Sequence, residues 1–483
     1  MQMKAPHEAN AQVLAGPCNF TTPPETLGHA VSVYTSLSQD PEVFPLEKRK
    51  KFILVATGMA LFVGVLVDLV VNPFPDSLLL TLGWPILAAL LSAWTVAVNT
   101  NHKHYCTFAA TRGAMHTEQQ GLFPAISSNS FHFETAKFLV KHHHTHAVAS
   151  HYLFHAVEDE EFHFRWVDDQ HHVLHQIDGL NDHRNSFSEP LQNYYFGSAV
   201  ELNWTRYLLR QHGADIRNGT AIRFPLNERG NDYIELSGER FRYAIKDEEG
   251  EHGYEEVAES FRGERDFDIG IYDLENKGEL QGHQWIKFPY PAIPNELLFM
   301  KLWELRTGTK VEVHHLLPEA ETFTKDPVTD LILSALFLER LEQSISRHAR
   351  RDTTLAVLIV EVANIAFIKH ALGREAGVEV LKTLAKRMKS AVRRGDTVGR
   401  LWRDEFGITL TDLKAEALEQ VIEGIREELI KPIPTPRGDA YAELHLGWAI
   451  YPENGNNNRN LLRHARYQAY QNRIDAVLEH PEL

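Results

Sequence analysis

Two long apolar runs near the start of the chain restrict what it can fold into more than any other feature. Residues 52–71 include one charged side chain, Asp68, and residues 78–98 include none. A helix of about 20 apolar residues crosses the hydrocarbon core of a bilayer, so each run predicts a membrane span. Residues 72–77 lie between the runs with the sequence NPFPDS, which predicts a turn that ends the first helix. The alternative is a buried helical hairpin in a soluble core.

The charges beside the two runs predict the orientation of this hairpin. The segment 47–51 reads EKRKK, Lys103 follows the second run, and the turn between the runs contains no Lys or Arg. Basic residues collect on the cytoplasmic side of membrane proteins, so we expect both termini to be cytoplasmic. Residues 1–40 contain no apolar stretch of the kind found in a secretory signal.

Composition limits the partners and the redox chemistry that we expect. The formal net charge is -16, so free nucleic acid is not an expected partner, because its phosphates would be repelled. Cys18 and Cys106 are too few and too far apart in sequence to suggest a disulfide framework or a zinc ribbon. This use of cysteine is compatible with a reducing cytoplasm.

The chain divides into a tail, the hairpin and three further regions, and the whole reads as an α+β protein. The sequence after the hairpin has a helix-like pattern. It is followed by short stretches in which apolar and polar residues alternate, such as Tyr233–Leu236 and Phe241–Ile245, and these predict strands. The middle regions contain no motif that assigns them to a known family. The predicted regions are a cytoplasmic tail at 1–47, a transmembrane hairpin at 48–101, a mainly helical, His-rich region at 102–217, a β-rich region at 218–320 and a C-terminal domain at 326–476.

Helices alternate with strands in the C-terminal domain. The spacing of apolar residues predicts helices at 333–348, 378–391, 415–429 and 460–474. The continuous apolar run at 355–360 predicts a central strand, and further strands are expected in a hairpin at 398–410 and at 443–450. This alternation predicts a sheet with helices packed on it.

Four motifs in this domain fall in the order of the GGDEF, or diguanylate cyclase-like, family. Residues 326–331 (DPVTDL) are similar to the family's D-x-L-T-G-L, and residues 447–452 (GWAIYP) and 464–470 (HARYQAY) are similar to a later strand and the closing helix. The domain therefore resembles a GGDEF domain, which implies an α/β fold with a central, mostly antiparallel sheet. The place of the signature R-[LY]-G-G-[DE]-E-F is taken by residues 400–406, which include Trp402, Arg403, Asp404, Glu405 and Phe406.

Departures from the family pattern fall on residues that carry its chemistry. The resemblance implies metal-binding carboxylates at Glu361 and Asp404, where charge is kept, whereas Ala363 replaces a further carboxylate. Trp402 and Arg403 replace two glycines whose bare backbone lets nucleotide phosphates approach. These losses predict a domain that binds no divalent metal and makes no cyclic di-GMP. A metal held by Glu361 and Asp404 is the alternative.

Nucleotide recognition is affected as well. Lys369 and Val378 stand where family members carry an Asn and an acid that read guanine, and neither can form those hydrogen bonds. Arg393 and Asp396 keep the R-x-x-D pattern of the family's inhibitory site. Because a guanidinium group can pair with a guanine edge or a phosphate, Arg393 and Asp396 are a candidate site for cyclic di-GMP. The alternative is that Arg393 only caps a helix and Asp396 only begins a turn.

The chain has 27 histidines, and many of them lie between His102 and His183. Histidines four residues apart share one face of a helix, and interleaved carboxylates would complete a di-metal centre in a helical bundle. The alternatives are a polar helical surface without metal, or a surface that gains charge near pH ~6.5. The candidate ligands are His142, His146, His151, His155, Glu160, His163, His171 and His175.

The layout of membrane hairpin, middle region and inactive GGDEF domain resembles that of membrane-anchored receptors for cyclic di-GMP. The first hypothesis is a non-catalytic regulator at the bacterial inner membrane, which binds cyclic di-GMP or a protein partner, controls a membrane assembly and could form a homodimer. The second hypothesis is a scaffold whose GGDEF fold mediates only protein contacts. The third is a metal-dependent enzyme built on the His-rich region.

Overall fold

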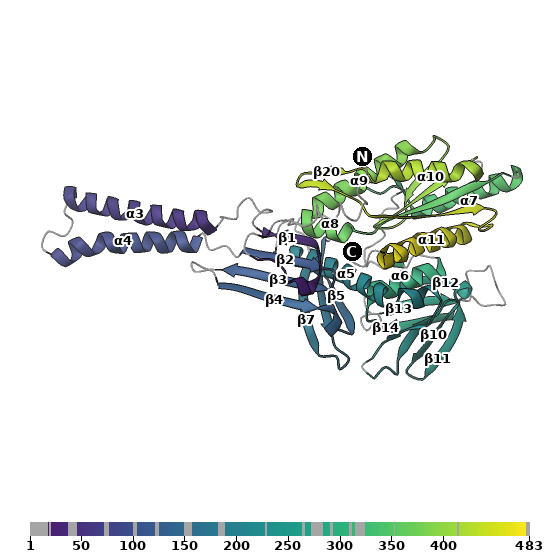
Figure 1. The fold of residues 1–483 in the computed structure, drawn as a ribbon, viewed down its shortest axis with the longest axis horizontal. Helices are drawn as coiled ribbons and strands as arrows, with labels where there is room; N and C mark the ends of the chain where they lie inside the picture. Colours follow the sequence, from purple (N-terminus) through teal and green to yellow (C-terminus); the bar gives the residue numbers. More distant parts are fainter. Residues whose placement is uncertain are drawn as a thin grey trace.

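In the computed structural model a helical hairpin projects from a body of sheets and helices (Figure 1). The content is a mixture of helices and strands, as an α+β protein requires. Short 3-10 turns lie at Glu25–Leu27, Phe133–Thr135 and Tyr254–Glu256. The structure describes residues 18, 21–36, 46–71, 77–99, 104–120, 125–148, 157–181, 189–227, 229–262, 266–271, 284–289, 293–308, 312–313, 324–351, 353–412 and 415–479.

The hairpin consists of α3 (Leu46–Val71) and α4 (Leu78–Asn99), which pack along each other. Trp84 Nε1 of α4 donates to Asp68 Oδ1 of α3 at 2.6 Å, so the one acid in the first apolar run has a partner. Among the described residues, one helix segment, Lys50–Val71, is long and apolar enough to cross a membrane, and the apolar part of α4 is shorter. The predicted pair of spans is therefore not confirmed.

The hairpin is inserted between two neighbouring strands of one sheet. Strands β1 (Ala30–Thr35), β2 (His104–Ala110), β3 (Gly113–Gln120) and β4 (Ala125–His132) form an antiparallel sheet in that order. Both ends of the hairpin thus join the same sheet. The structure also forms a disulfide between Cys18 and Cys106 of β2. Their separation of 88 residues gave no reason to expect this bond, and Cys18 packs on the hydrophobic cluster that contains Cys106 and Leu27.

The next segment is a sheet where helices were expected. Strands β5 (Phe138–Val148), β6 (Val157–Val167) and β7 (Val173–Asn181) form a three-stranded sheet, and α5 (Glu189–Arg217) packs on it. The prediction that 102–217 is mainly helical is wrong over these strands. In β6 the side chains of Phe162, Phe164 and Trp166 are buried while the residues between them are not, which is the period of a strand.

Two further sheets and one helix complete the middle of the chain. Strands β8 (Ile222–Pro225), β9 (Tyr233–Leu236), β10 (Arg240–Ile245) and β11 (Glu248–Gly253) form one sheet. Strands β12 (Val257–Arg262), β13 (Asp266–Ile271), β14 (Gln284–Pro289) and β15 (Glu312–Val313) form the other. The helix α6 (Glu296–Thr307) buries Phe299 and Trp303 against these strands. This helix lies next to the C-terminal domain.

The C-terminal domain has a five-stranded sheet in the order β16-β18-β19-β17-β22. All of its strand pairs are antiparallel except β16 with β18. Its strands are β16 (Ile332–Leu333), β17 (Leu355–Val362), β18 (Thr397–Arg400), β19 (Glu405–Leu410) and β22 (Leu444–Tyr451), and β20 (Ile433–Thr435) pairs with β21 (Gly438–Ala440). Its helices are α7 (Ser334–Arg351), α8 (Ile365–Leu372), α9 (Arg374–Ala391), α10 (Ala415–Leu429) and α11 (Asn458–Glu479).

The central strand β17 is buried along its whole length and packs on helices at both faces. Ala356, Leu358 and Val360 belong to the hydrophobic cluster that includes α8, α9 and α10. Leu355, Val357 and Ile359 belong to the cluster with α7 and α11. Because side chains alternate along a strand, Glu361 continues the second set and points to the α11 side of the sheet.

Candidate functional site

The turn that carries the signature residues is held by Arg400. Arg400 Nη1 lies 2.8 Å from Asp326 Oδ2, and Arg400 Nη2 donates to the carbonyl of Arg403 at 2.6 Å. The backbone N–H groups of Leu401 and Trp402 both donate to the carbonyl of Glu405, which closes the turn. Burial alone would raise the pKa of Asp326, but hydrogen bonds from Thr329 and Arg400 hold it below its ordinary value. The opening motif of the domain is thereby joined to the signature turn.

The structure brings Glu361 and Asp404 together, as the resemblance implies. Glu361 is near the end of β17, and the next residue, Val362, donates its N–H to the carbonyl of Asp404 at 2.8 Å. Glu361 also pairs with Glu405 across β17 and β19. Carboxylate oxygens are the ligands that Mg²⁺ and Mn²⁺ prefer. By donor type, the pair suits a divalent ion.

A lysine from outside the domain lies between these two carboxylates. Lys301 of α6 places its Nζ 2.7 Å from Glu361 Oε1 and 3.9 Å from Asp404 Oδ2. Burial alone would lower the pKa of Lys301, but the charges of Glu361 and Asp404 raise it above its ordinary value, so the group is an ammonium ion. A divalent ion therefore does not fit between Glu361 and Asp404 while Lys301 is there.

Two arginines of α11 complete this charged layer. Arg473 Nη1 lies 3.1 Å from Glu361 Oε1, and Arg466 Nη2 lies 2.8 Å from Glu405 Oε1. Burial alone would lower the pKa of each arginine, but the charge of its glutamate raises it. Within the described ranges, no three His, Cys, Asp or Glu side chains are grouped so that they could hold a metal ion. The acids on this face are neutralised by protein cations.

The space left at this place is small. A cavity of about 30 Å³ is lined by residues from α6, β17, β19 and α11, including Lys301, Glu361 and Tyr470. Sites for ligands of nucleotide size have volumes of about 300 Å³ or more. This cavity is too small for a nucleotide.

Other cations lie on the far side of the signature turn. Burial, with the guanidinium groups of Arg403, Arg374 and Arg400 nearby, lowers the pKa of Lys369 to about 8. Lys369 therefore remains mostly protonated at neutral pH. Arg403 is exposed and Trp402 is partly buried, so both side chains occupy space beside Asp404. This side of the turn has the charge that phosphate groups require.

Arg393 and Asp396 lie in the turn between α9 and β18. Asp396 Oδ2 accepts from the backbone N–H of Arg393 at 2.9 Å, and Asp396 Oδ1 accepts from the backbone N–H of Thr411 at 2.9 Å. The carboxylate thus stabilises the turn, while the side chain of Arg393 is exposed. These contacts position Arg393 and leave the predicted binding of cyclic di-GMP untested.

Among the described residues, the histidine candidates do not form a cluster of three or more ligands. His142 is on β5 and faces His163 of β6, and His163 Nδ1 lies 2.6 Å from Asp178 Oδ1. His175 points to the opposite face, where it is buried against Phe131, and burial lowers its pKa to about 4.

The remaining candidates are spread over strands and turns. Glu160 accepts from Asn181 Nδ2 at 2.9 Å, and His171 lies in the turn between β6 and β7. His146 is in β5, which is a strand and not the helix on which the spacing of His142 and His146 was interpreted. His151 and His155 lie outside the described residues. Where the structure describes this segment before α5, it forms strands and turns and not the helix on which the metal site was predicted.

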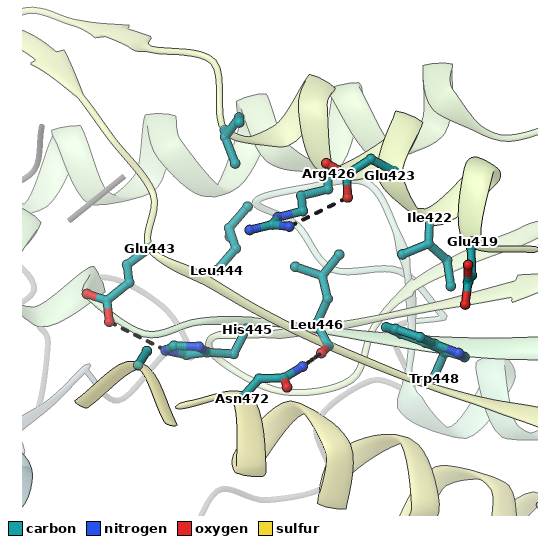
Figure 2. A pocket seen from close by; sticks show the side chains of 12 residues that line it. Glu419, Ile422, Glu423, Arg426, Glu443, Leu444, His445, Leu446, Trp448 and Asn472 are labelled. Atoms are coloured by element: carbon teal, nitrogen blue, oxygen red, sulfur yellow. Dashed lines mark hydrogen bonds and ion pairs between the residues drawn. The ribbon is translucent and has the colours of Figure 1, made fainter. Parts of the chain in front are cut away.

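A larger cavity of about 680 Å³ lies elsewhere in the domain, between α10, β22 and α11 (Figure 2). Trp448, Leu446 and Ile422 supply its apolar side, and Glu443 and His445 lie together at one end. Asn472 Nδ2 of α11 donates to the carbonyl of Leu446 at 2.7 Å, which caps the outer edge of β22. The signature residues do not line this cavity.

Comparisons with known proteins identify the domain. Residues 323–475 match the family model for the diguanylate cyclase GGDEF domain. Diguanylate cyclase TpbB of Pseudomonas aeruginosa (strain UCBPP-PA14) is 29% identical over 227 residues, which cover 44% of this chain and 47% of that protein. Diguanylate cyclase DgcP of P. aeruginosa PAO1 is 30% identical over 131 residues, which cover 27% of this chain and 20% of that protein.

Solved structures give matches to the same family. A structure of TpbB from P. aeruginosa PAO1 that comprises only the GGDEF domain is 30% identical, covers 30% of this chain and 86% of that one, and has a TM-score of 0.30. The chain spans about half, or less, of the length of the curated relatives it matches. Residues 323–475 are a GGDEF domain with diguanylate cyclase homologues, which confirms the prediction from the motifs.

The same comparisons contradict two predictions. The hypothesis of a non-catalytic receptor or scaffold is wrong, and so is the prediction that the chain is not an enzyme, because the relatives of its domain are diguanylate cyclases. Those predictions rested on the combined changes at Trp402, Arg403, Ala363, Lys369 and Val378. Side chains at glycine positions change how a phosphate is approached, but they leave Glu361 and Asp404 in place.

Proposed function

We propose that this chain is a diguanylate cyclase that joins two molecules of GTP into cyclic di-GMP. The observation that carries this proposal is the meeting of Glu361 and Asp404 inside a domain matched to the cyclase family. Curated relatives of the domain are named diguanylate cyclases. Arg400 supports the site, because it fixes the signature turn to Asp326.

Phosphate binding in this site would differ from that over a glycine turn. Lys369 and Arg403 are cations close enough to affect each other, and phosphoryl transfer depends on positioning and on neutralising phosphate charge. Arg403 can form two parallel hydrogen bonds with a phosphate, whereas a glycine offers only backbone N–H groups. Lys369 and Arg403 would orient the phosphates of GTP beside Asp404.

The hairpin would hold the cyclase at the bacterial inner membrane with both termini in the cytoplasm, where GTP is available. Large apolar side chains on its outer surface, such as Leu54 and Leu69, are 75% and 80% exposed. Exposed apolar surface of this extent is typical of contact with lipid or with a partner protein. Two GTP molecules must meet for the reaction, and a homodimer of this chain would bring two sites together.

Synthesis of cyclic di-GMP by the purified full chain tests the proposal. The chain in lipid nanodiscs is incubated with GTP and Mg²⁺ or Mn²⁺, and the product is measured by liquid chromatography with mass spectrometry. We expect cyclic di-GMP from the wild type or from a variant with Lys301 replaced, and none from Asp404→Asn. Absence of cyclic di-GMP from both the wild type and the Lys301 variant at millimolar Mn²⁺ would contradict the proposal that the chain is a cyclase.

Arg393 and Asp396 are proposed to bind the product, cyclic di-GMP, as the R-x-x-D pattern implies. Arg393→Ala is expected to weaken binding of cyclic di-GMP about tenfold or more, because a charged hydrogen-bonding group contributes roughly 1.5–3 kcal/mol. Calorimetric titration of the full chain measures this. Arg394→Ala is the matched control, since it removes a neighbouring exposed arginine that is outside the pattern. Equal affinities for the two variants would show that Arg393 is not a ligand.

A further inference from the structure

Helix α6 belongs to the middle region but presents one side chain to the GGDEF domain. Trp303 Nε1 donates to Ser260 Oγ at 2.9 Å, and Leu298 and Phe299 are buried in the same cluster as the middle strands. Lys301 lies on another side of α6, and its side chain is 14% exposed. The helix is thus fixed to one part of the chain while its lysine enters the candidate site of another.

The contact also extends beyond Lys301. Arg466 Nη1 of α11 donates to the carbonyl of Gly308, directly after α6, at 2.6 Å. Glu304 and Leu305 of α6 line the same small cavity as Glu361 and Tyr470. The C-terminal part of α6, from Lys301, and the residue after the helix therefore cover the end of β17.

We propose that Lys301 keeps the cyclase inactive by occupying the position of the divalent ion between Glu361 and Asp404. The inference rests on the proposed function, since it concerns the regulation of that same site. An ammonium ion 2.7 Å from Glu361 and 3.9 Å from Asp404 satisfies both acids and repels a second cation. Helix α6 must withdraw before a metal ion enters between Glu361 and Asp404, because Lys301 fills that position and the cavity beside it holds only about 30 Å³.

The energetics favour an exchange between two states. Withdrawal of Lys301 leaves two acids with less neutralising charge in a site of low dielectric, which is unfavourable without compensation. A divalent ion supplies that compensation when it enters. Metal and nucleotide therefore bind the open state, and each shifts the population toward it. A signal that moves α6 would act on the same equilibrium.

Binding of Mn²⁺ to the full chain in nanodiscs, followed by electron paramagnetic resonance, tests the occupation of the metal position. Lys301→Met keeps a long unbranched side chain, one atom shorter, and removes its charge, and we expect it to bind Mn²⁺ at least about tenfold more tightly than the wild type does. Lys301→Arg should behave like the wild type. Lys287→Met is the matched control, because Lys287 pairs with Asp268 at 3.8 Å on an exposed surface. Equal Mn²⁺ affinity in Lys301→Met and the wild type overturns the inference.

A double variant and a measurement on the wild type test whether misfolding of Lys301→Met could explain its change in Mn²⁺ affinity. Lys301→Met with Asp404→Asn should lose the added Mn²⁺ affinity, which places the ion at this pair. In the wild type, acetylation of Lys301 measured by mass spectrometry should be slower than that of Lys287 and should rise several-fold with Mn²⁺ and GTP. The concentrations of Mn²⁺ and GTP are those that saturate the Lys301→Met variant. If the rate of acetylation of Lys301 in the wild type is unchanged at these concentrations, the proposed withdrawal of α6 is overturned.

The outcomes separate this inference from the proposed function. If Lys301→Met gains Mn²⁺ affinity and makes no cyclic di-GMP, the cyclase is rejected and Lys301 remains the group that occupies the metal position. If cyclic di-GMP is formed equally by the wild type and Lys301→Met, with equal Mn²⁺ affinity, the cyclase stands and the blocking role of Lys301 is rejected.

Discussion

Replacing Arg206 with leucine is expected to destabilise the chain by about 3–5 kcal/mol, since it leaves Glu443, a mostly buried acid with a side chain that is 17% exposed, without its main partner. Arg206 is on α5, its side chain is 3% exposed, and its Nη2 lies 2.5 Å from Glu443 Oε2. Its guanidinium also lies 4.8 Å from the centre of the Phe367 ring. Burial alone would raise the pKa of Glu443, but Arg206 and His445 hold it far below its ordinary value. Glu443 thus stays charged.

Urea denaturation of the full chain at neutral pH measures this loss. The matched control is Arg223→Leu, because Arg223 forms an Arg–Glu pair with Glu235 while its side chain is 53% exposed, and exposed pairs contribute about 1 kcal/mol or less. A double variant with leucine at 206 and 443 should recover much of the stability, because it removes the unpaired charge. If Arg206→Leu and Arg223→Leu unfold at the same urea concentration, the pair of Arg206 and Glu443 does not stabilise the contact between α5 and the GGDEF domain.

The C-terminal domain could be predicted because its local patterns and its fold agree. The apolar run at 355–360 became the buried β17, and the helix predicted at 415–429 is α10. Motif spacing also placed Glu361 beside Asp404. Each of these inferences depends on residues near one another in sequence, or on a family pattern that fixes their separation.

The rest of the site depends on contacts that no local pattern contains. Lys301 is 60 residues before Glu361 and lies outside the motif-bearing domain. The prediction of a helical metal site in the His-rich region was wrong for a different reason. Residues four apart share one face in a strand as well as in a helix, so the spacing of the histidines does not distinguish the two. Alternation of Phe162, Phe164 and Trp166 with polar residues was the signal that could have identified the sheet.

Mild acid is expected to weaken the contact between the GGDEF domain and the sheet that carries the hairpin. His370 of α8 is fully buried, and its Nδ1 lies 2.5 Å from Ser32 Oγ of β1 while its Nε2 lies 2.7 Å from Thr107 Oγ1 of β2. Burial lowers the pKa of His370 to about 3. Its other described ring neighbours, Tyr34 and Phe196, carry no charge that could favour protonation.

The direction in which stability changes with pH follows from whether the folded or the unfolded chain takes up the proton. Above about pH 6.5 the ring is neutral in both states, so His370 adds no pH dependence there. Between about pH 6.5 and 3 the unfolded chain binds the proton and the folded chain does not, so stability falls with pH and levels off below the folded pKa. At pH 5 the expected loss is about 2 kcal/mol relative to pH 7.5.

The loss assigned to His370 is isolated by comparing urea denaturation of the wild type and His370→Gln at pH 7.5 and 5. His370→Gln should be less stable at pH 7.5, and its deficit should shrink by about 2 kcal/mol at pH 5, since glutamine has no proton to gain. His172→Gln is the control, because that side chain is 70% exposed beside Asp168. A deficit that stays constant with pH would mean that His370 is not buried between β1 and β2. If it shrinks as expected, the two strands that flank the hairpin are joined to the GGDEF domain through a neutral histidine.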